Sequence, residues 1–190
     1  FSPFIFQSST HPVFLAILFL SINLFSYRNN KLKSFHDINR DSLGTIFFPI
    51  SFIVLAIPFW ENKYFISSSF MILAISDPLA SIIGTYYKKA HFYKISKEKK
   101  SMEGSFIMFL STFILLLFLS SIIFNGLSLI DSIIAIFICS IFITISESIS
   151  IKGSDNLSIP ITAFMFIEMF NYLNEIDQII QFSIVLFLMT

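Results

Sequence analysis

The sequence predicts an all-α, multi-pass transmembrane helical bundle of about seven spans, with six spans as the alternative. Of its 190 residues, 55% are hydrophobic and only 13% are charged, whereas a soluble domain carries about 25% charged residues. The apolar residues lie in long blocks separated by short polar stretches, and the mean hydropathy is +0.82. This pattern is typical of helices that lie in lipid rather than in water.

Each expected span is an apolar run close to the length that crosses a bilayer, which is about 20 residues with a range of about 17–25. Together the runs form one integral-membrane domain, residues 1–190. Because the sequence opens on Phe1 rather than on methionine, we expect this domain to lack an N-terminal segment. The expected spans are residues 12–26, 43–60, 64–87, 105–124, 127–146, 157–173 and 178–190, of which the first and last are the shortest.

Basic residues gather in alternate loops, and this sets the expected orientation. Alternating spans put the first, third and fifth loops on the same side of the membrane. Basic residues in short loops mark the cytoplasmic side, so we expect these three loops to face the cytoplasm. They contain eleven of the twelve basic residues: Arg28, Lys31, Lys33, Arg40, Lys88, Lys89, Lys94, Lys97, Lys99, Lys100 and Lys152.

Several function classes are excluded by composition and motif. The net charge is zero, and the sequence lacks the basic-aromatic interleaving of single-strand binding proteins, so no nucleic-acid partner is expected. Cys139 lies inside an apolar run and is expected to be a small core residue. The three histidines match no zinc pattern. There is no P-loop, kinase glycine loop or G-x-S-x-G elbow, so any phosphate chemistry must use another architecture.

An ionisable residue, Asp77, lies inside the third expected span and is followed directly by Pro78. Proline disfavours the α conformation at the preceding residue and removes a backbone donor. We therefore expect the helix to break at Asp77 and to restart at Pro78. Asp77 then either caps the restarted helix or lines a polar cavity, where it ligates Mg²⁺ or positions a substrate hydroxyl.

The end of the third loop combines lysines with an expected helix N-terminus. An exposed N-terminus and neighbouring lysines favour an anionic phosphate. Gly104 permits close backbone approach, while Ser101 and Ser105 offer hydroxyls. The alternative is a solvated basic loop that contacts only anionic lipid headgroups. The residues concerned are Lys99, Lys100, Ser101, Glu103, Gly104 and Ser105.

The fifth loop places Glu147, Lys152, Asp155 and Asn156 within ten residues. Asp155 or Asn156 can simply N-cap the next helix, which tolerates Pro160 in its first turn. Yet carboxylates from the third span and from the third and fifth loops converge on one face. Carboxylate oxygens hold Mg²⁺, and lysines offset phosphate charge. The set therefore predicts a magnesium-nucleotide site.

Three blocks, in this order, resemble the membrane family of CTP-dependent lipid kinases (the polyprenol kinase family). That family includes phytol kinase, dolichol kinase and the CTP-using diacylglycerol kinase, and it is similar to phosphatidate cytidylyltransferases. The departures from its pattern are Ser76, where glycine is expected, and the Thr85–Lys88 stretch after Gly84. The blocks are NRDSLGTIFFPISF leading on to SDPLASIIG, then KSMEGS, then ESISIKGSDNLSIP, and they cover most of residues 40–160.

The resemblance implies transfer of the γ-phosphoryl group of CTP to a lipid hydroxyl with Mg²⁺ as cofactor. Membrane-embedded, the protein would take CTP from the cytoplasm and the lipid alcohol from the bilayer; the sequence leaves the lipid and the oligomeric state open. The expected catalytic residues are Asp77, Glu103 and Glu147. The expected metal ligands are Asp77, Glu103 and Asp155. The expected phosphate-binding residues are Lys99, Lys100, Ser101, Gly104, Ser105, Lys152 and Asn156.

Two other functions fit the same residues. A phosphatidate cytidylyltransferase would use the same nucleotide, but a lipid phosphate would attack the α-phosphorus and release pyrophosphate. A small membrane transporter would use a broken third span and Asp77 without any chemistry. The transporter predicts that KSMEGS is dispensable, whereas both enzymes need it.

Overall fold

A computed structural model describes residues 2–29, 43–86, 91–95, 99–124 and 126–172. Apart from one short hairpin and the connecting turns, this part of the chain is helical. The seventh expected span, 178–190, and the first four residues of the block that begins at Asn39 lie outside these residues. The elements, in order, are α1 Ser2–Ile5, α2 Thr10–Asn29, α3 Gly44–Phe59, α4 Lys63–Tyr86, β1 Phe92–Tyr93, β2 Lys100–Ser101, α5 Met102–Ile123, α6 Leu129–Ile149 and α7 Asp155–Tyr172.

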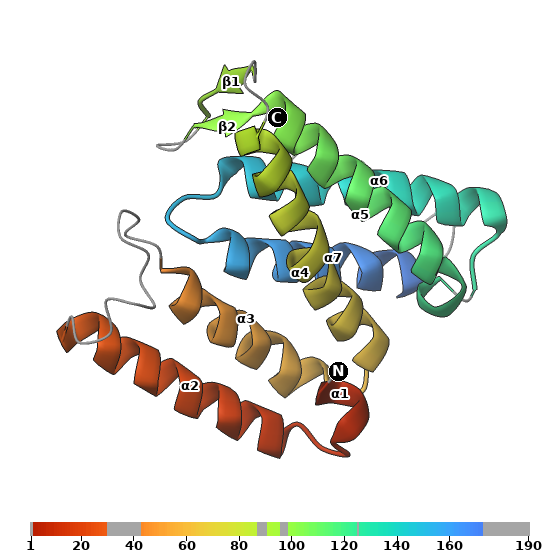
Figure 1. Ribbon diagram of the computed structural model, residues 1–190. Helices are drawn as coiled ribbons and strands as arrows, with labels where there is room; N and C mark the ends of the chain where they lie inside the picture. The colour runs from red at the N-terminus through yellow and green to blue at the C-terminus, as the bar shows by residue number, and fades with distance from the viewer. Residues whose placement is uncertain (1, 30–42, 87–90, 96–98, 125, 173–190) are drawn as a thin grey trace.

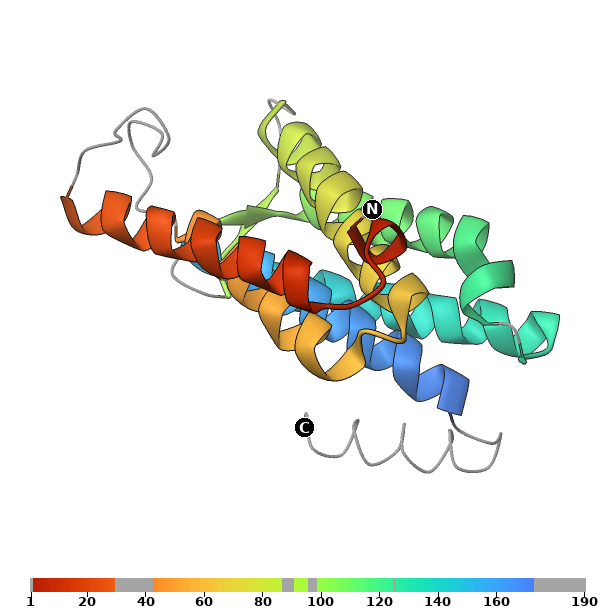
Figure 2. The same ribbon diagram turned by 90° about the horizontal axis from the view of Figure 1, so that it is seen from below.

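The helices form one bundle, with α4, α5, α6 and α7 at its centre (Figure 1). Helix α4 packs along α5 and α7, and α6 packs between α5 and α7. Helix α3 lies against α7, and α2 lies against α3 at the edge of the bundle, as both views show (Figure 2). The main core is apolar and is built from α4 to α7, with Ile72, Met108, Ile136, Ile143 and Ile167 fully buried in it. The predicted all-α bundle is confirmed.

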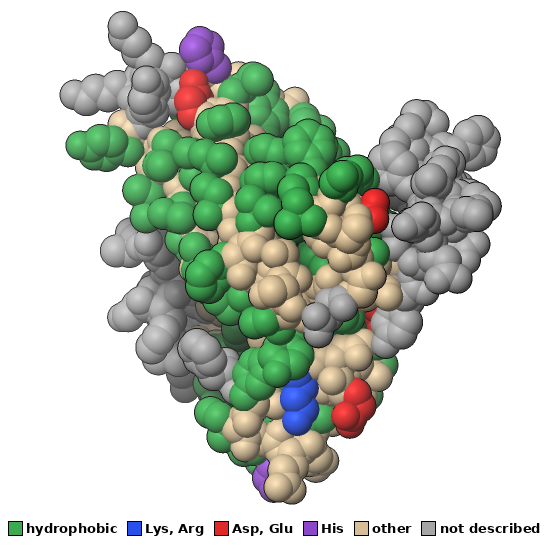
Figure 3. Space-filling model, turned by 90° about the vertical axis from the view of Figure 1, so that its right-hand side faces the viewer, with side chains coloured by type: hydrophobic (Ala, Val, Ile, Leu, Met, Phe, Trp, Pro, Cys, Tyr) green, Lys and Arg blue, Asp and Glu red, His purple; other side chains and the backbone are tan. Residues whose placement is uncertain are grey.

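Among the described helices, four (α2, α4, α5 and α6) are long and apolar enough to cross a membrane. Helix α3 is apolar but has only 16 residues. Large apolar side chains cover much of the outer surface, including Phe118 at 83% exposure and Phe106 at 61%. Figure 3 shows one such face, where apolar side chains dominate and charged side chains are isolated. In water this surface would be strongly unfavourable, so the described helices belong in lipid.

Helix α4 is continuous through Pro78, so the predicted break at Asp77 is wrong. The proline ring leaves the Ala74 carbonyl without its helical donor. The helix nevertheless continues because it packs along its length against α5 and α7, and packing can outweigh a local propensity. Asp77 therefore projects from a regular helix and caps no second one.

Three chain connections meet at one end of the bundle. The Leu43 amide, just before α3, donates to the Lys152 carbonyl at 2.8 Å. Lys100, just before α5, donates to Ser150, just after α6, at 3.2 Å. The described ends of the first, third and fifth loops therefore lie at the same end of the bundle, as predicted. At the opposite end, Asn62 donates to Glu168 at 3.2 Å.

Candidate functional site

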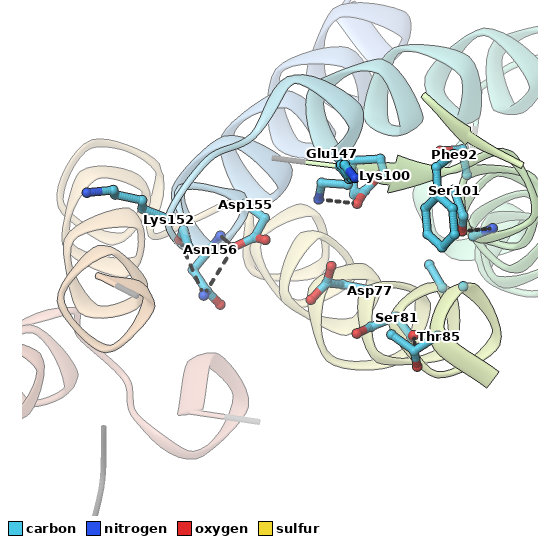
Figure 4. A pocket seen from close by; sticks show the side chains of 16 residues that line it. Asp77, Ser81, Thr85, Phe92, Lys100, Ser101, Glu147, Lys152, Asp155 and Asn156 are labelled. Atoms are coloured by element: carbon cyan, nitrogen blue, oxygen red, sulfur yellow. Dashed lines mark hydrogen bonds and ion pairs between the residues drawn. The ribbon is translucent and has the colours of Figure 1, made fainter. Parts of the chain in front are cut away.

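A cavity of about 510 Å³ lies at the end of the bundle where these loops meet. It is bounded by the C-terminal halves of α4 and α6, the first turns of α5 and α7, and the hairpin (Figure 4). All the expected site residues except Glu103 line it. The lining residues are Asp77, Ala80, Ser81, Gly84, Thr85, Phe92, Lys99, Lys100, Ser101, Gly104, Ser105, Glu147, Lys152, Gly153, Asp155 and Asn156.

Helix α4 presents one polar face to this cavity. Asp77, Ser81 and Thr85 are four residues apart, so they lie above one another on the same face. Figure 4 shows the carboxylates of Asp77 and Asp155, from α4 and α7, directed into the same space. The side chains of Asp155, Glu147 and Lys100 line the same cavity as Asp77. Within the described chain, no hydrogen-bond donor is placed against the Asp77 carboxylate, which leaves it open to a ligand.

A buried ion pair crosses the cavity from the hairpin to α6. The Lys100 ammonium lies 2.5 Å from Glu147 Oε1, and their side chains are only 17% and 8% exposed. Lys100 also donates to the Ser150 hydroxyl. Because Glu147 lies in the last turn of α6, the pair ties the start of α5 to the end of α6. The Lys100 ammonium is therefore held at the cavity wall by Glu147 and by Ser150.

The start of α5 is held by side-chain capping. Ser101 is the N-cap, and its hydroxyl accepts a hydrogen bond from the Gly104 amide at 3.0 Å. The Met102 amide donates to the His91 carbonyl. The Met102 and Gly104 amides, at the start of α5, therefore already have acceptors within the protein. Anion binding at this helix start would depend more on the lysines, and less on free amides, than the sequence analysis expected.

Glycine is required where α4 crosses the start of α5. A Cβ at Gly84 would lie 2.6 Å from the Ser101 hydroxyl, and a Cβ at Gly104 would lie 2.8 Å from the same oxygen. The Gly104 Cβ would also approach the Ala80 carbonyl to 3.1 Å. The two backbones therefore approach closely, as small residues permit between membrane helices. This contact presses the Ser101 cap against α4.

Glu103 does not join the other carboxylates. Its two oxygens accept hydrogen bonds from the His91 amide at 3.0 and 3.1 Å, and it lies 2.8 Å from His91 Nδ1. Among the described residues, no group of three or more His, Cys, Asp or Glu side chains is placed to hold a metal. The expected three-ligand set of Asp77, Glu103 and Asp155 is therefore not assembled. In α5, Glu103 faces the hairpin instead, because its first-turn position points it at the preceding strand.

The connection from α6 to α7 has an unusual backbone. Lys152 has φ 50° and Gly153 has φ 83°, a region that few non-glycine residues adopt. Helix α7 begins at Asp155, so Asp155 and Asn156 lie in its first turn. Asp155 Oδ1 accepts the Asn156 amide at 2.8 Å. The tight turn thus brings the Lys152, Asp155 and Asn156 side chains to one cavity wall.

The residues present fit a magnesium ion held partly by its substrate. Mg²⁺ keeps near-octahedral oxygen ligands and usually takes only one or two carboxylates together with phosphate oxygens. Asp77 and Asp155 offer two carboxylates in one cavity, and Glu147 is already neutralised by Lys100. A bound cation would offset the repulsion between Asp77 and Asp155.

Sequence reasoning missed several lining residues. Ser81 and Thr85 were recognisable from their spacing of four and eight from Asp77. Gly84 was noticed only as part of a block, and Phe92 gave no signal because a two-residue strand has no periodicity. Outside the lining set, Tyr93 and Ser148 hydrogen-bond beside the cavity, and only the tertiary structure brings them together.

Comparison with known proteins finds one informative relative. The chain is 31% identical over 144 residues to the phytol kinase of Synechocystis sp., an alignment that covers 74% of this chain and 60% of that protein. The chain thus spans about 60% of the length of the curated relative that it matches. No protein-family profile matches the chain, and no solved structure matches it.

Proposed function

We propose that the protein is an integral-membrane lipid-alcohol kinase that transfers the γ-phosphoryl group of CTP to the hydroxyl of a phytol-like or polyprenol-like lipid, with Mg²⁺. The observation that carries the proposal is the cavity itself. Carboxylates and lysines from four separate segments line one cavity at the end of an apolar bundle. The similarity to a phytol kinase supports a lipid alcohol as the acceptor.

In this proposal the triphosphate lies along the hairpin side of the cavity. Lys100 and Lys99 would offset phosphate charge there, and Lys152 would contribute from the turn between α6 and α7. Asp77 and Asp155 would hold Mg²⁺, which would draw charge from the phosphate oxygens when bound. Glu147 keeps Lys100 in place rather than binding metal, because the two already form an ion pair.

The acceptor would approach from the α4 side. Its apolar tail stays in lipid while its hydroxyl reaches Asp77, whose carboxylate is open. The hydroxyl oxygen attacks the γ-phosphorus, the bond from that phosphorus to the β–γ bridging oxygen breaks, and CDP leaves. Asp77 would use one carboxylate oxygen for Mg²⁺ and the other to orient the hydroxyl and accept its proton. The loops that carry the cavity would face the cytoplasm, where the nucleotide is available.

Phe92 favours a nucleotide over a simple polyphosphate as donor. Its ring is 64% exposed, and it lines the cavity beside Ser101, its partner across the hairpin. Nucleobases stack on such exposed aromatic rings. The variant Phe92→Ala is expected to bind CTP about tenfold or more weakly. Inhibition by tripolyphosphate, which has no base, should stay unchanged, and equal weakening of both would remove this role.

The test is transfer by the purified full chain in lipid nanodiscs. CTP labelled in the γ- or the α-phosphate is offered with phytol, a polyprenol, diacylglycerol or phosphatidate, with and without Mg²⁺, and ATP is offered in parallel. The proposal expects γ-label in a phospholipid, with release of CDP. Transfer of the α-label to phosphatidate, with release of pyrophosphate, would instead identify a cytidylyltransferase. Absence of any transfer would leave transport as the better explanation. The break in the third span that suggested a transporter is, however, not present in α4.

A further inference from the structure

The hairpin that carries Lys100 and Ser101 is joined to the bundle by three hydroxyl groups. The Tyr93 hydroxyl, on β1, donates to the Ser148 hydroxyl, on α6, at 2.8 Å. It also lies 2.5 Å from the Ser105 hydroxyl, on α5. Ser105 is 12 positions and Ser148 is 55 positions from Tyr93 in the sequence. One side chain therefore bridges the hairpin to two helices.

The protons in this cluster fix the direction of each bond. A hydroxyl has a single proton to donate. Because Tyr93 donates to Ser148, Ser105 must donate to Tyr93. Ser148 is only 7% exposed, so its oxygen has little access to replacement water. The Ser105 proton is thereby committed to the hairpin, although the sequence had suggested that Ser105 binds phosphate.

Tyr93 and Lys100 share one face of the hairpin. The two residues are paired directly across the antiparallel strands, and directly opposed side chains lie on the same face. Lys100 reaches Glu147 and Ser150 on this face, next to Ser148. The strands are only two residues long, too short to hold a position unaided. The place of the Lys100 ammonium therefore depends on what anchors β1 as well as on its own bonds to Glu147 and Ser150.

We infer that Tyr93 is a positioning residue that locks the β1–β2 hairpin onto α5 and α6 and so fixes Lys100 for the donor phosphates. This inference rests on the proposed function for its kinetic consequence, but not for the anchoring itself. At its base the hairpin is held by the bonds of His91 to Met102 and Glu103. Tyr93 supplies the second attachment, on the side that faces Glu147.

The test removes only the hydroxyl. Tyr93→Phe is expected to raise the KM for CTP about tenfold, because two hydrogen bonds that aim a charged group are lost. The KM for the lipid alcohol should stay within about twofold, because the Tyr93 hydroxyl bonds α5 and α6 and not α4. Ser148→Ala should have a smaller effect, because it removes only one of the two hydrogen bonds of the Tyr93 hydroxyl. The double variant should be no worse than Tyr93→Phe alone.

Tyr64→Phe is the matched control, since Tyr64 is an exposed tyrosine near the opposite end of the bundle; it should leave both KM values unchanged. Hydrogen exchange gives a readout that needs no activity. The Met102 amide, which donates to His91, should exchange faster in Tyr93→Phe and at the normal rate in Tyr64→Phe. Unchanged exchange at Met102 would overturn the inference, and so would equal changes in both KM values. If the parent protein transfers no phosphoryl group, the proposed function fails and the exchange data alone decide on the anchor.

Discussion

At the scale of single residues, the ion pair of Lys100 and Glu147 has two expected roles: it stabilises the fold, and it holds a cation that the transfer reaction needs. With both side chains largely buried, removing one partner leaves an uncompensated charge. Lys100→Met is therefore expected to destabilise the protein by about 3–5 kcal/mol and to abolish transfer. Thermal unfolding in detergent measures the first effect and the transfer assay measures the second.

The double variant Lys100→Met with Glu147→Gln separates these two roles. Replacing both members of a buried pair is often close to neutral for stability. We expect most of the lost stability to return while transfer stays absent, because the cation that faces the phosphates is still missing. A double variant that regained activity would show that Lys100 serves the fold only.

The close approach of α4 and α5 gives a second prediction for single residues. In Gly84→Ala the new Cβ would fall 2.6 Å from the Ser101 hydroxyl, so the N-cap must move. Loss of a cap destabilises by about 0.5–2 kcal/mol, and the unfolding temperature and transfer rate should both fall. Gly126→Ala is the control, because nothing lies within 4 Å of its Cβ. In a Ser101→Gly background, Gly84→Ala should have little further effect; an undiminished effect would contradict this explanation.

Helix α4 shows at the scale of an element why a local signal can mislead. A proline after an aspartate indicates a helix boundary in water, yet α4 runs from Lys63 to Tyr86 without interruption. In lipid the backbone has no water to bond once a helix opens, so continuing the helix is favoured. The intact helix also keeps Asp77 in register with Ser81 and Thr85 on the cavity face.

Pro78→Ala tests this explanation. The alanine amide can bond the Ala74 carbonyl, so the unfolding free energy should rise by up to about 3 kcal/mol. Transfer should change little, because Asp77 keeps its place on a helix of the same register. A large loss of activity in a well-folded variant would instead support a functional break at this position.

At the scale of the whole molecule, the bundle separates an apolar body from one polar end. The turns before α3, before α5 and before α7 join there, and the cavity lies among them. Because the loops at this end carry most of the basic residues, we expect this end to face the cytoplasm. A phosphate donor would then reach the cavity from water, and an acceptor would reach it from lipid.

Cysteine labelling tests this orientation. The buried Cys139 is first replaced by alanine, and single cysteines are then placed at Ile95, near the cavity end, or at Leu129, near the other end. Both native side chains are well exposed, at 67% and 77%. On intact cells a membrane-impermeant maleimide should label Leu129→Cys only, and permeabilised cells should show both. The reverse pattern would place the cavity outside the cell.

The sequence by itself determined that the helices lie in lipid, that the fold is all-α and that three loops lie on the same side. Long apolar runs and loop charges can be read locally, without knowing which segments pack together. It also pointed to most of the residues that line the cavity. Tertiary structure alone decided that α4 stays intact, that Glu103 binds His91 instead of joining Asp77, and that Tyr93, Ser105 and Ser148 form one cluster. Each of these depends on packing between segments far apart in the chain, where the energy of a contact outweighs the preference of any single residue.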